Sequence, residues 1–216
     1  MFSIDLTKYL PAIRTLKPLS DSRFLYEINR WSKLDPKYKE LISDFENKEI
    51  SRFNVIESYK DYYENNGSIK KAFLLTMVWG FANTGYGWHR TNKYLSTSEN
   101  LELIEKAISA LRENNLKSAF SNLKRIKWLG VSYITKVLYF ASIALNQKKY
   151  PLIYDIRVTS ALVKLTSPKE VHEIISVGPS SKFSDYEKYN TLIHSVAYNH
   201  RVEAESIEMF LFNQKF

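Results

Sequence analysis

Apolar side chains recur at three- and four-residue steps along almost the whole chain, and this periodicity constrains the fold more than any other feature. Such spacing puts the apolar residues on one face of an α-helix. Only six glycines occur in 216 residues, which leaves few of the tight turns that a β-rich fold requires. The sequence therefore predicts an all-α fold.

Local start and stop signals set the bounds of several predicted helices. In Leu34-Asp35-Pro36 an aspartate precedes a proline, which suits the cap and the first position of a helix. Asn65-Asn66-Gly67 ends one predicted helix, and Ser68 caps the next. Only Tyr150–Tyr154 is predicted to be extended. The predicted helices are Ser22–Lys33, Pro36–Glu46, Ser51–Asn65, Ser68–Ala82, Ser98–Glu113, Leu116–Ile126, Thr135–Asn146, Arg157–Leu165, Pro168–Ser176, Ser184–Asn199 and Ala204–Asn213.

Composition excludes several classes of protein. With 44% hydrophobic residues, among them 15 Tyr and 12 Phe, the chain is too apolar to be disordered. The absence of cysteine excludes disulfides, a thiolate nucleophile and cysteine-based zinc or iron–sulfur sites, and the four histidines lack close metal-ligand spacing. No long apolar window and no secretory signal pattern occur. We expect a single cytoplasmic domain over residues 1–216, without a metal or a membrane anchor.

A basic stretch without acids occupies the middle of the chain. No Asp or Glu occurs from Asn114 to Tyr154, and the acid after Asp155 is Glu170. A charge run alone is usually a solvated face, but this one coincides with a glycine turn in a chain of net charge +8. It therefore favours a nucleic-acid partner. The basic residues of the stretch are Lys117, Lys124, Arg125, Lys127, Lys136, Lys148 and Lys149.

Lys136 and Asp155 lie nineteen residues apart, separated by an apolar helical segment and a short return. At about 1.5 Å per residue the helix carries the chain roughly 15–18 Å away. The eight or nine residues that follow can span about 26–30 Å when extended, so Asp155 can return to Lys136. An amine beside a carboxylate is a candidate nucleophile and base. Lys136 could instead contact a phosphate, and Asp155 could cap the helix that begins near Arg157.

The segment before Lys136 is typical of two helices joined by a glycine turn. The turn Lys127-Trp128-Leu129-Gly130-Val131-Ser132 follows the helix Leu116–Ile126 and precedes a helix from about Thr135. Such a helix–hairpin–helix points backbone N–H groups at a DNA phosphate, which gives contact without reading the base. The candidate DNA-contacting residues of this hairpin are Lys124, Arg125, Lys127, Gly130 and Ser132.

The hairpin, Thr135-Lys136-Val137 and Leu152-Ile153-Tyr154-Asp155 together resemble the helix–hairpin–helix DNA glycosylase superfamily, in its 8-oxoguanine DNA glycosylase branch. The resemblance covers about residues 68–213 and is strongest over about 115–160. It implies a two-lobed helical fold, a monomer acting without a cofactor, and double-stranded DNA with a flipped base as partner. It also implies that Lys136 attacks the sugar C1′ while Asp155 supports the charge changes.

A second match to the family lies between two predicted helices, in Trp79-Gly80-Phe81-Ala82-Asn83 and Trp88-His89-Arg90. The resemblance implies that Asn83 and Arg90 fill the gap left by the flipped base and contact its partner base. Tyr86 and Trp88 could stack on bases or wedge into the duplex, or could pack in the core. Candidates for the base pocket are Phe140, His194 and Tyr198, with core packing as the alternative for Phe140.

The chain departs from the family pattern at the hairpin. The family's Pro-Gly-Val-Gly is here Leu129-Gly130-Val131-Ser132, and two extra residues precede the lysine, so a shifted register would put Ile134 at the lysine position. No counterpart of the β-sheet domain of the eukaryotic enzymes occurs in residues 1–67, so recognition of 8-oxoguanine is not carried over.

The resulting hypothesis is a DNA N-glycosylase, with strand cleavage by β-elimination if Lys136 forms a Schiff base. Compact bacterial relatives resemble proteins of phage defence, so a modified phage base such as a modified cytosine is a candidate target beside an oxidised purine. A non-catalytic helix–hairpin–helix module would use the basic stretch without the Lys136–Asp155 pair. A nucleosidase acting on free nucleotides or RNA would use a pocket with less of the basic stretch.

Overall fold

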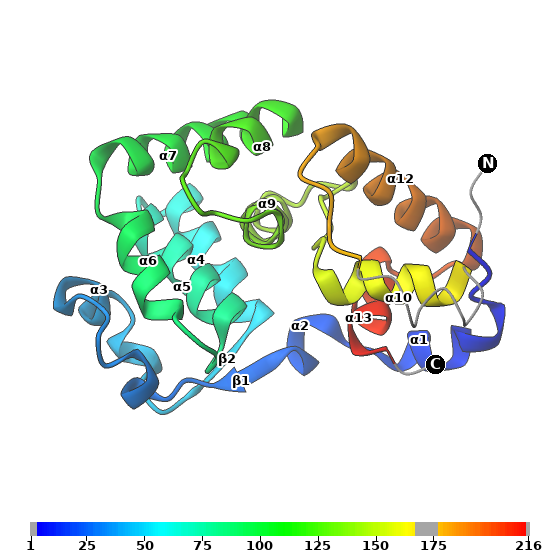
Figure 1. The fold of residues 1–216 in the computed structure, drawn as a ribbon, viewed down its shortest axis with the longest axis horizontal. Helices are drawn as coiled ribbons and strands as arrows, with labels where there is room; N and C mark the ends of the chain where they lie inside the picture. Colours follow the sequence, from blue (N-terminus) through cyan, green and yellow to red (C-terminus); the bar gives the residue numbers. More distant parts are fainter. Residues whose placement is uncertain (1–3, 167–176, 215–216) are drawn as a thin grey trace.

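The computed structural model describes residues 4–166 and 177–214 (Figure 1). The elements up to Ser51 are short: the 3-10 helices η1 Thr7–Tyr9, η2 Ile28–Trp31 and η3 Ser43–Phe45, the α-helices α1 Leu10–Thr15, α2 Pro18–Asp21 and α3 Pro36–Leu41, and the strands β1 Arg23–Leu25 and β2 Glu49–Ser51. The helices that follow are α4 Arg52–Glu64, α5 Ile69–Phe81, α6 Gly87–Leu95, α7 Ser98–Arg112, α8 Leu116–Lys124, α9 Val131–Ala144, α10 Ile156–Thr166, α12 Phe183–His200 and α13 Ala204–Asn213.

The helices form two groups with α9 between them, which confirms the predicted all-α, two-lobed fold (Figure 1). In one group α4, α5, α7 and α8 pack on α9, and in the other α1, α10 and α12 pack on α13. The groups meet where α8 contacts α12 and where α2 contacts both α4 and α13. One continuous cluster of buried side chains runs from Ile4 to Leu211 and joins the groups through their common core.

Helix α9 is buried because it is apolar on nearly every side. A helix of this composition is stable only inside a protein. Val137, Leu138 and Phe140 have no exposed surface, and burying each such side chain contributes about 1.5–3 kcal/mol. The segment that carries Lys136 is therefore held rigidly in the centre of the molecule.

Several predicted helix ends are present. The Asp35 side chain accepts a hydrogen bond from the backbone N–H of Lys37 and caps α3. Ser68 caps α5 by accepting from the N–H of Lys71. Ser51 begins α4 with a reciprocal pair of hydrogen bonds to Asn54, so both residues satisfy N–H groups that the first turn of a helix leaves free.

The predicted helix Ser22–Lys33 is wrong. Its first half is the strand β1, which pairs antiparallel with β2 so that Arg23 faces Ser51 and Leu25 faces Glu49. Its second half is the 3-10 helix η2. The pairing partner lies more than twenty residues further along the chain, and a three-residue strand is too short to show an alternating pattern. The local periodicity therefore did not indicate a strand.

Other predictions needed smaller corrections. The predicted helix Pro36–Glu46 is divided into α3 and η3, and α6 is a helix that the predicted set did not include. Tyr150–Tyr154 carries no regular structure, and side chains of α12 and α9 pair with its backbone groups: Asn190 accepts from the N–H of Leu152, and Thr135 accepts from the N–H of Tyr154. The predicted helix Pro168–Ser176 lies outside the described residues. In the described part, no helix is long and apolar enough to cross a membrane.

A candidate active site between the two helix groups

Lys136 and Asp155 meet as their spacing predicted. The Lys136 Nζ lies 3.0 Å from Asp155 Oδ2, and the two side chains are only 6% and 15% exposed. Lys136 comes from α9, while Asp155 lies immediately before α10, at the end of the segment that follows Tyr150. The pair therefore joins the first helix group to the second.

Ser132 lies between the two charged groups. Its hydroxyl accepts a hydrogen bond from Lys136 Nζ at 2.6 Å and donates one to Asp155 Oδ2. Ser132 and Lys136 are four residues apart on α9, so they share one face of the helix. The sequence predicted Ser132 as a DNA contact of the hairpin, and the structure places its side chain inside the Lys136–Asp155 pair.

Helix α9 begins earlier than predicted, and this places the lysine. Gly130 is its N-cap and Val131 its first residue, so Lys136 lies in the second turn and not at the helix start. The two extra residues of the hairpin are thus absorbed into the helix. Ile134, the alternative in a shifted register, is a core residue with 1% of its surface exposed.

Two glycines lie beside this helix, and only Gly80 makes room for it. A Cβ at Gly80 in α5 would lie 3.1 Å from Lys136 Cδ and 3.1 Å from a ring carbon of Tyr133, so glycine allows the lysine side chain to pass. Gly130 has an ordinary φ, and a Cβ there would meet open space. The fold itself does not require glycine at position 130, whereas a phosphate approaching the backbone closely would.

Asp155 is held as a carboxylate. Burial would raise its pKa, but the positive charge of Lys136 and hydrogen bonds from Ser132, Lys136 and the backbone N–H of Arg157 outweigh this and lower the pKa. The Arg157 N–H donates to Oδ1 at 3.1 Å, which caps α10. The capping role that the sequence allowed for Asp155 therefore coexists with its contact to Lys136.

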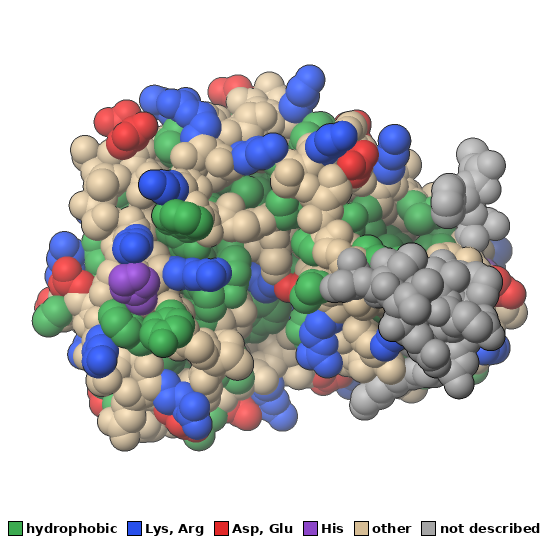
Figure 2. Space-filling model, viewed as in Figure 1, with side chains coloured by type: hydrophobic (Ala, Val, Ile, Leu, Met, Phe, Trp, Pro, Cys, Tyr) green, Lys and Arg blue, Asp and Glu red, His purple; other side chains and the backbone are tan. Residues whose placement is uncertain are grey.

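The pair opens into a cavity of about 420 Å³, a volume typical of small-molecule sites. Figure 2 shows the surface hollowed between the two helix groups. Besides Lys136 and Asp155, the lining includes four aromatic residues and a second charged pair: Phe24, Trp79, Phe81, Phe212, Arg52 and Glu208.

Arg52 and Glu208 form an ion pair at 2.9 Å, with 2% and 1% of their side chains exposed. The guanidinium also lies over the ring of Trp79, at 5.4 Å. Nevertheless the Arg52 Nε and the Glu208 Oε1 are buried without a hydrogen-bond partner. Buried polar atoms are nearly always paired, so an unpaired donor and an unpaired acceptor beside this cavity are an exception. Both atoms are shielded from solvent, and a ligand would reach them only after the two side chains turn towards the cavity.

The sequence did not indicate this second pair. Arg52 and Glu208 are 156 residues apart, and no spacing argument connects them. One available signal was Glu208 itself, a lone acid within the apolar run Ser206-Ile207-Glu208-Met209-Phe210-Leu211, where an unpaired charge would be costly.

Three predicted pocket residues lie elsewhere. Phe140 is fully buried behind Trp79, which it meets edge-on at 5.1 Å, and it does not line the cavity. His194 contacts the carbonyl of Tyr150 at 2.8 Å and lines a different cavity together with Tyr198. Helix α13, and not α12, supplies the late-chain part of the lining.

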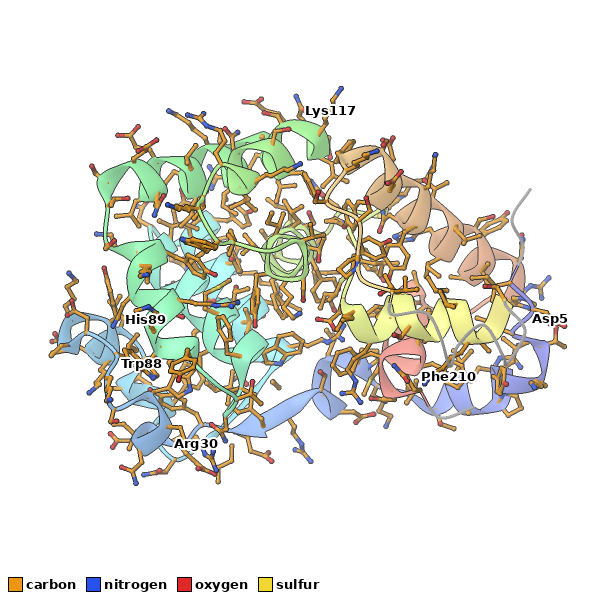
Figure 3. The ribbon with its side chains drawn as sticks, in the orientation of Figure 1. Asp5, Arg30, Trp88, His89, Lys117 and Phe210 are labelled. Carbon is orange, nitrogen blue, oxygen red and sulfur yellow. The ribbon has the colours of Figure 1, made fainter. Side chains whose placement is uncertain are left out.

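The segment between α5 and α6 forms a second, smaller cavity of about 210 Å³, lined in part by Asn83 and Trp88. The Asn83 Nδ2 donates to the carbonyl of Leu25, while its Oδ1 is buried without a partner. Trp88 is half-buried, whereas Tyr86 is 75% exposed and Arg90 is exposed. Figure 3 shows Trp88 at the same end of the molecule as Arg30.

The hairpin presents its predicted cations to solvent. Lys124, Arg125 and Lys127 are exposed, although Lys124 Nζ also donates to the carbonyl of Ser181. The sequence reasoning missed Trp128, which is 68% exposed and has a φ of 71°, an unusual value for a bulky side chain. Its carbonyl accepts a hydrogen bond from the Tyr94 hydroxyl, which ties the hairpin to α6.

Fold, hairpin and charged pair together define a helix–hairpin–helix glycosylase-like protein. The model of the family described as "Putative 8-oxoguanine DNA glycosylase OGG-like protein" matches residues 17–212, and the chain belongs to this family. Neither the curated proteins nor the solved structures contain a match. In the described part of the chain, no group of three His, Asp or Glu side chains could hold a metal ion.

Proposed function

We propose that this protein is a DNA N-glycosylase that takes a damaged or modified base out of duplex DNA and cleaves its glycosidic bond. The observation that carries the proposal is the Lys136–Asp155 pair, 3.0 Å apart on the wall of the 420 Å³ cavity. Membership of the family supports the same reaction. An extruded base that enters the cavity would bring its sugar to the pair.

The chemistry follows from the two side chains. The neutral amine of Lys136 attacks C1′ while the base departs with the bonding electrons. Positive charge develops on the sugar at that moment, and the carboxylate of Asp155 stabilises it. If the resulting adduct becomes a Schiff base, β-elimination cuts the strand.

The cavity suits a planar, polar ligand. Phe24, Trp79 and Phe212 provide aromatic surface for stacking. Once their side chains turn towards the cavity, the unpaired Arg52 Nε can donate to a base acceptor and the unpaired Glu208 Oε1 can accept from a base N–H. Oxidised purines and modified cytosines both present such edges, so both belong in the test.

The test is single-turnover base release with borohydride trapping on duplexes carrying oxidised purines, modified cytosines or normal bases, beside free nucleosides. Release from at least one modified duplex is expected. Lys136→Gln should lower it about 100-fold and abolish trapping, and Asp155→Asn should lower it about 100-fold while DNA binding persists. Lys106→Gln, on the exposed surface of α7, is the matched control and should behave as the wild type.

A non-catalytic DNA-binding module is the second candidate, supported by the exposed cations of the hairpin. It predicts duplex binding without base release from any substrate. Release from free nucleosides alone would instead identify a nucleosidase. Trapping that survives in Lys136→Gln would assign the nucleophile to another lysine.

A further inference from the structure

The hydrogen bonds of Ser132 have a fixed direction. A lysine ammonium can only donate, and an ionised carboxylate can only accept. The Ser132 hydroxyl lies between the two, 2.6 Å from Lys136 Nζ and in contact with Asp155 Oδ2. It must therefore accept from Lys136 and give its single proton to Asp155.

This arrangement leaves the Ser132 side chain no proton for a phosphate. A contact from its hydroxyl to DNA would have to break the bond to Asp155, whose burial makes an unpaired oxygen costly. The backbone N–H of Ser132, in the first turn of α9, is unaffected by this. The side chain thus acts within the pair and not on the DNA backbone.

Ser132 also restricts the nucleophile. A lysine side chain is long and flexible, and it gives up rotamer entropy when it is fixed in one position. Two contacts, to Ser132 Oγ at 2.6 Å and to Asp155 Oδ2 at 3.0 Å, hold Lys136 Nζ, and a long contact to the Ser132 carbonyl at 3.4 Å adds little. Without the hydroxyl, Asp155 would be the only close hydrogen-bond partner of the ammonium, beside the long contact to the Ser132 carbonyl and the Tyr133 ring at 5.3 Å.

Resting on the proposed function, we propose that Ser132 is a positioning residue that holds the Lys136 amine and relays its proton to Asp155 before attack. An Nζ–H proton moves to Ser132 Oγ as the Ser132 hydroxyl proton moves to Asp155 Oδ2. This step yields a neutral amine with a free electron pair, an unchanged serine and a neutral carboxylic acid. The acid then protonates the departing base, and the carboxylate is restored as positive charge appears on the sugar–lysine adduct.

The test compares Ser132→Ala, Ser132→Thr and Ser121→Ala, a matched serine on the exposed surface of α8. Single-turnover base release should fall about 10-fold or more in Ser132→Ala. This is less than the roughly 100-fold or more that proton-transfer catalysis usually contributes, because Asp155 still touches the amine. Ser132→Thr, which keeps the hydroxyl, should restore most of the rate. Affinity for DNA should stay within about twofold, whereas a phosphate-contacting side chain would lower affinity and leave the saturated rate unchanged.

A second readout does not depend on activity. The pKa of Asp155, followed by 13C NMR, should rise in Ser132→Ala because the carboxylate then has one hydrogen-bond donor fewer, and the acid limb of the pH–rate profile should move up with it. The charged and titratable groups around Asp155 are Lys136 and Tyr133 on α9, Arg157 on α10, and Arg23, Arg52 and Glu208 across the cavity. All of them remain in both variants.

The outcomes separate the two proposals. An unchanged Asp155 pKa in Ser132→Ala would refute the hydrogen bond and the relay with it. A changed pKa with an unchanged rate would refute the relay alone and leave the glycosylase proposal standing. If the wild type releases no base from any substrate, the proposed function fails, and the relay fails with it.

Discussion

Asp155 uses its two oxygens for different tasks. Oδ1 accepts a hydrogen bond from the backbone N–H of Arg157 and fixes the start of α10. Oδ2 accepts hydrogen bonds from Lys136 Nζ and the Ser132 hydroxyl. One side chain therefore sets both the local structure and the charge of the site. Replacing it with asparagine keeps an oxygen for the cap, removes the negative charge and puts an NH2 donor where Oδ2 accepts from Lys136 and Ser132. Asp155→Asn therefore tests the pair while leaving the start of α10 in place.

The first prediction concerns pH. Because the folded-state pKa of Asp155 is lowered, its carboxylate stabilises the fold fully above its unfolded value of 3.8, and this contribution is lost as pH falls through the lower folded-state pKa. The difference in unfolding free energy between wild type and Asp155→Asn should thus shrink as pH drops from about 5 towards about 2. Urea unfolding across this range measures it. A difference that does not vary with pH would mean that the pair contributes no charge-dependent stability.

The second prediction concerns the buried pair at the cavity. Glu208→Ala leaves the Arg52 charge unpaired in the interior and should destabilise the fold by about 3–5 kcal/mol. The double variant Arg52→Met, Glu208→Leu should recover much of that loss, because apolar side chains need no partner. Thermal and urea unfolding measure both. Glu102→Ala, which breaks an exposed pair on α7, is the control and should change stability by less than about 1 kcal/mol.

The same double variant separates stability from function. If the double variant folds well but releases no base, Arg52 and Glu208 are needed to bind the ligand. If it folds well and keeps full base release, the free Nε and Oε1 atoms have no part in recognition.

At the scale of elements, the hairpin joins a helix that ends at the protein surface to a helix that is buried in the core. Helix α8 ends among exposed cations, whereas α9 runs inward and carries Lys136 on its second turn. The hairpin can therefore contact the DNA backbone at the protein surface, while the helix that follows it holds Lys136 in the interior. Figure 2 shows Lys and Arg side chains on the face over α8 and the hairpin.

The third prediction tests that surface. Replacing Lys124, Arg125 and Lys127 together with Gln should flatten the salt dependence of duplex binding by about 0.9 log units per log unit of salt for each phosphate that is no longer neutralised. Replacing Lys148 and Lys149 is the matched control, because α9 separates them from the hairpin by about 20 Å. An equal effect of both sets would show that the whole basic stretch acts as a diffuse charge, and no effect of either would remove the hairpin from the interface.

Elements that are specified by nearby residues, such as a helix cap or a turn, could be predicted from the sequence. Helix α5 has a capping serine and a preceding Asn-Gly stop, and the Lys136–Asp155 contact follows from a helix length and a return length. The strand β1 exists only through its pairing with β2, and the Arg52–Glu208 pair exists only once α4 and α13 have packed together. Such long-range contacts leave no local pattern, which is why much of the cavity was missed.

At the scale of the molecule, the cavity belongs to neither helix group alone. Phe24 follows the N-terminal helices, Trp79 lies on α5, Asp155 precedes α10 and Phe212 lies on α13. The lining therefore exists only while both groups are in place around α9. The continuous core supports the expectation that the two groups form one cooperative unit.

The fourth prediction tests this cooperativity by native-state hydrogen exchange in low urea. The buried amides of α9, including Val137 and Leu138, and those of α13, including Leu211, should exchange only through an opening equal in free energy to global unfolding. The reason is that α9 cannot lose its partners without exposing the shared core, and α13 cannot leave without unpairing Arg52. Glu208→Ala should lower the opening free energy of both helices by the same amount. A lower opening free energy for α10, α12 and α13, with full protection of α4 to α9, would contradict this prediction. The chain would then consist of two folding units, and the cavity between them would open when the second unit unfolds.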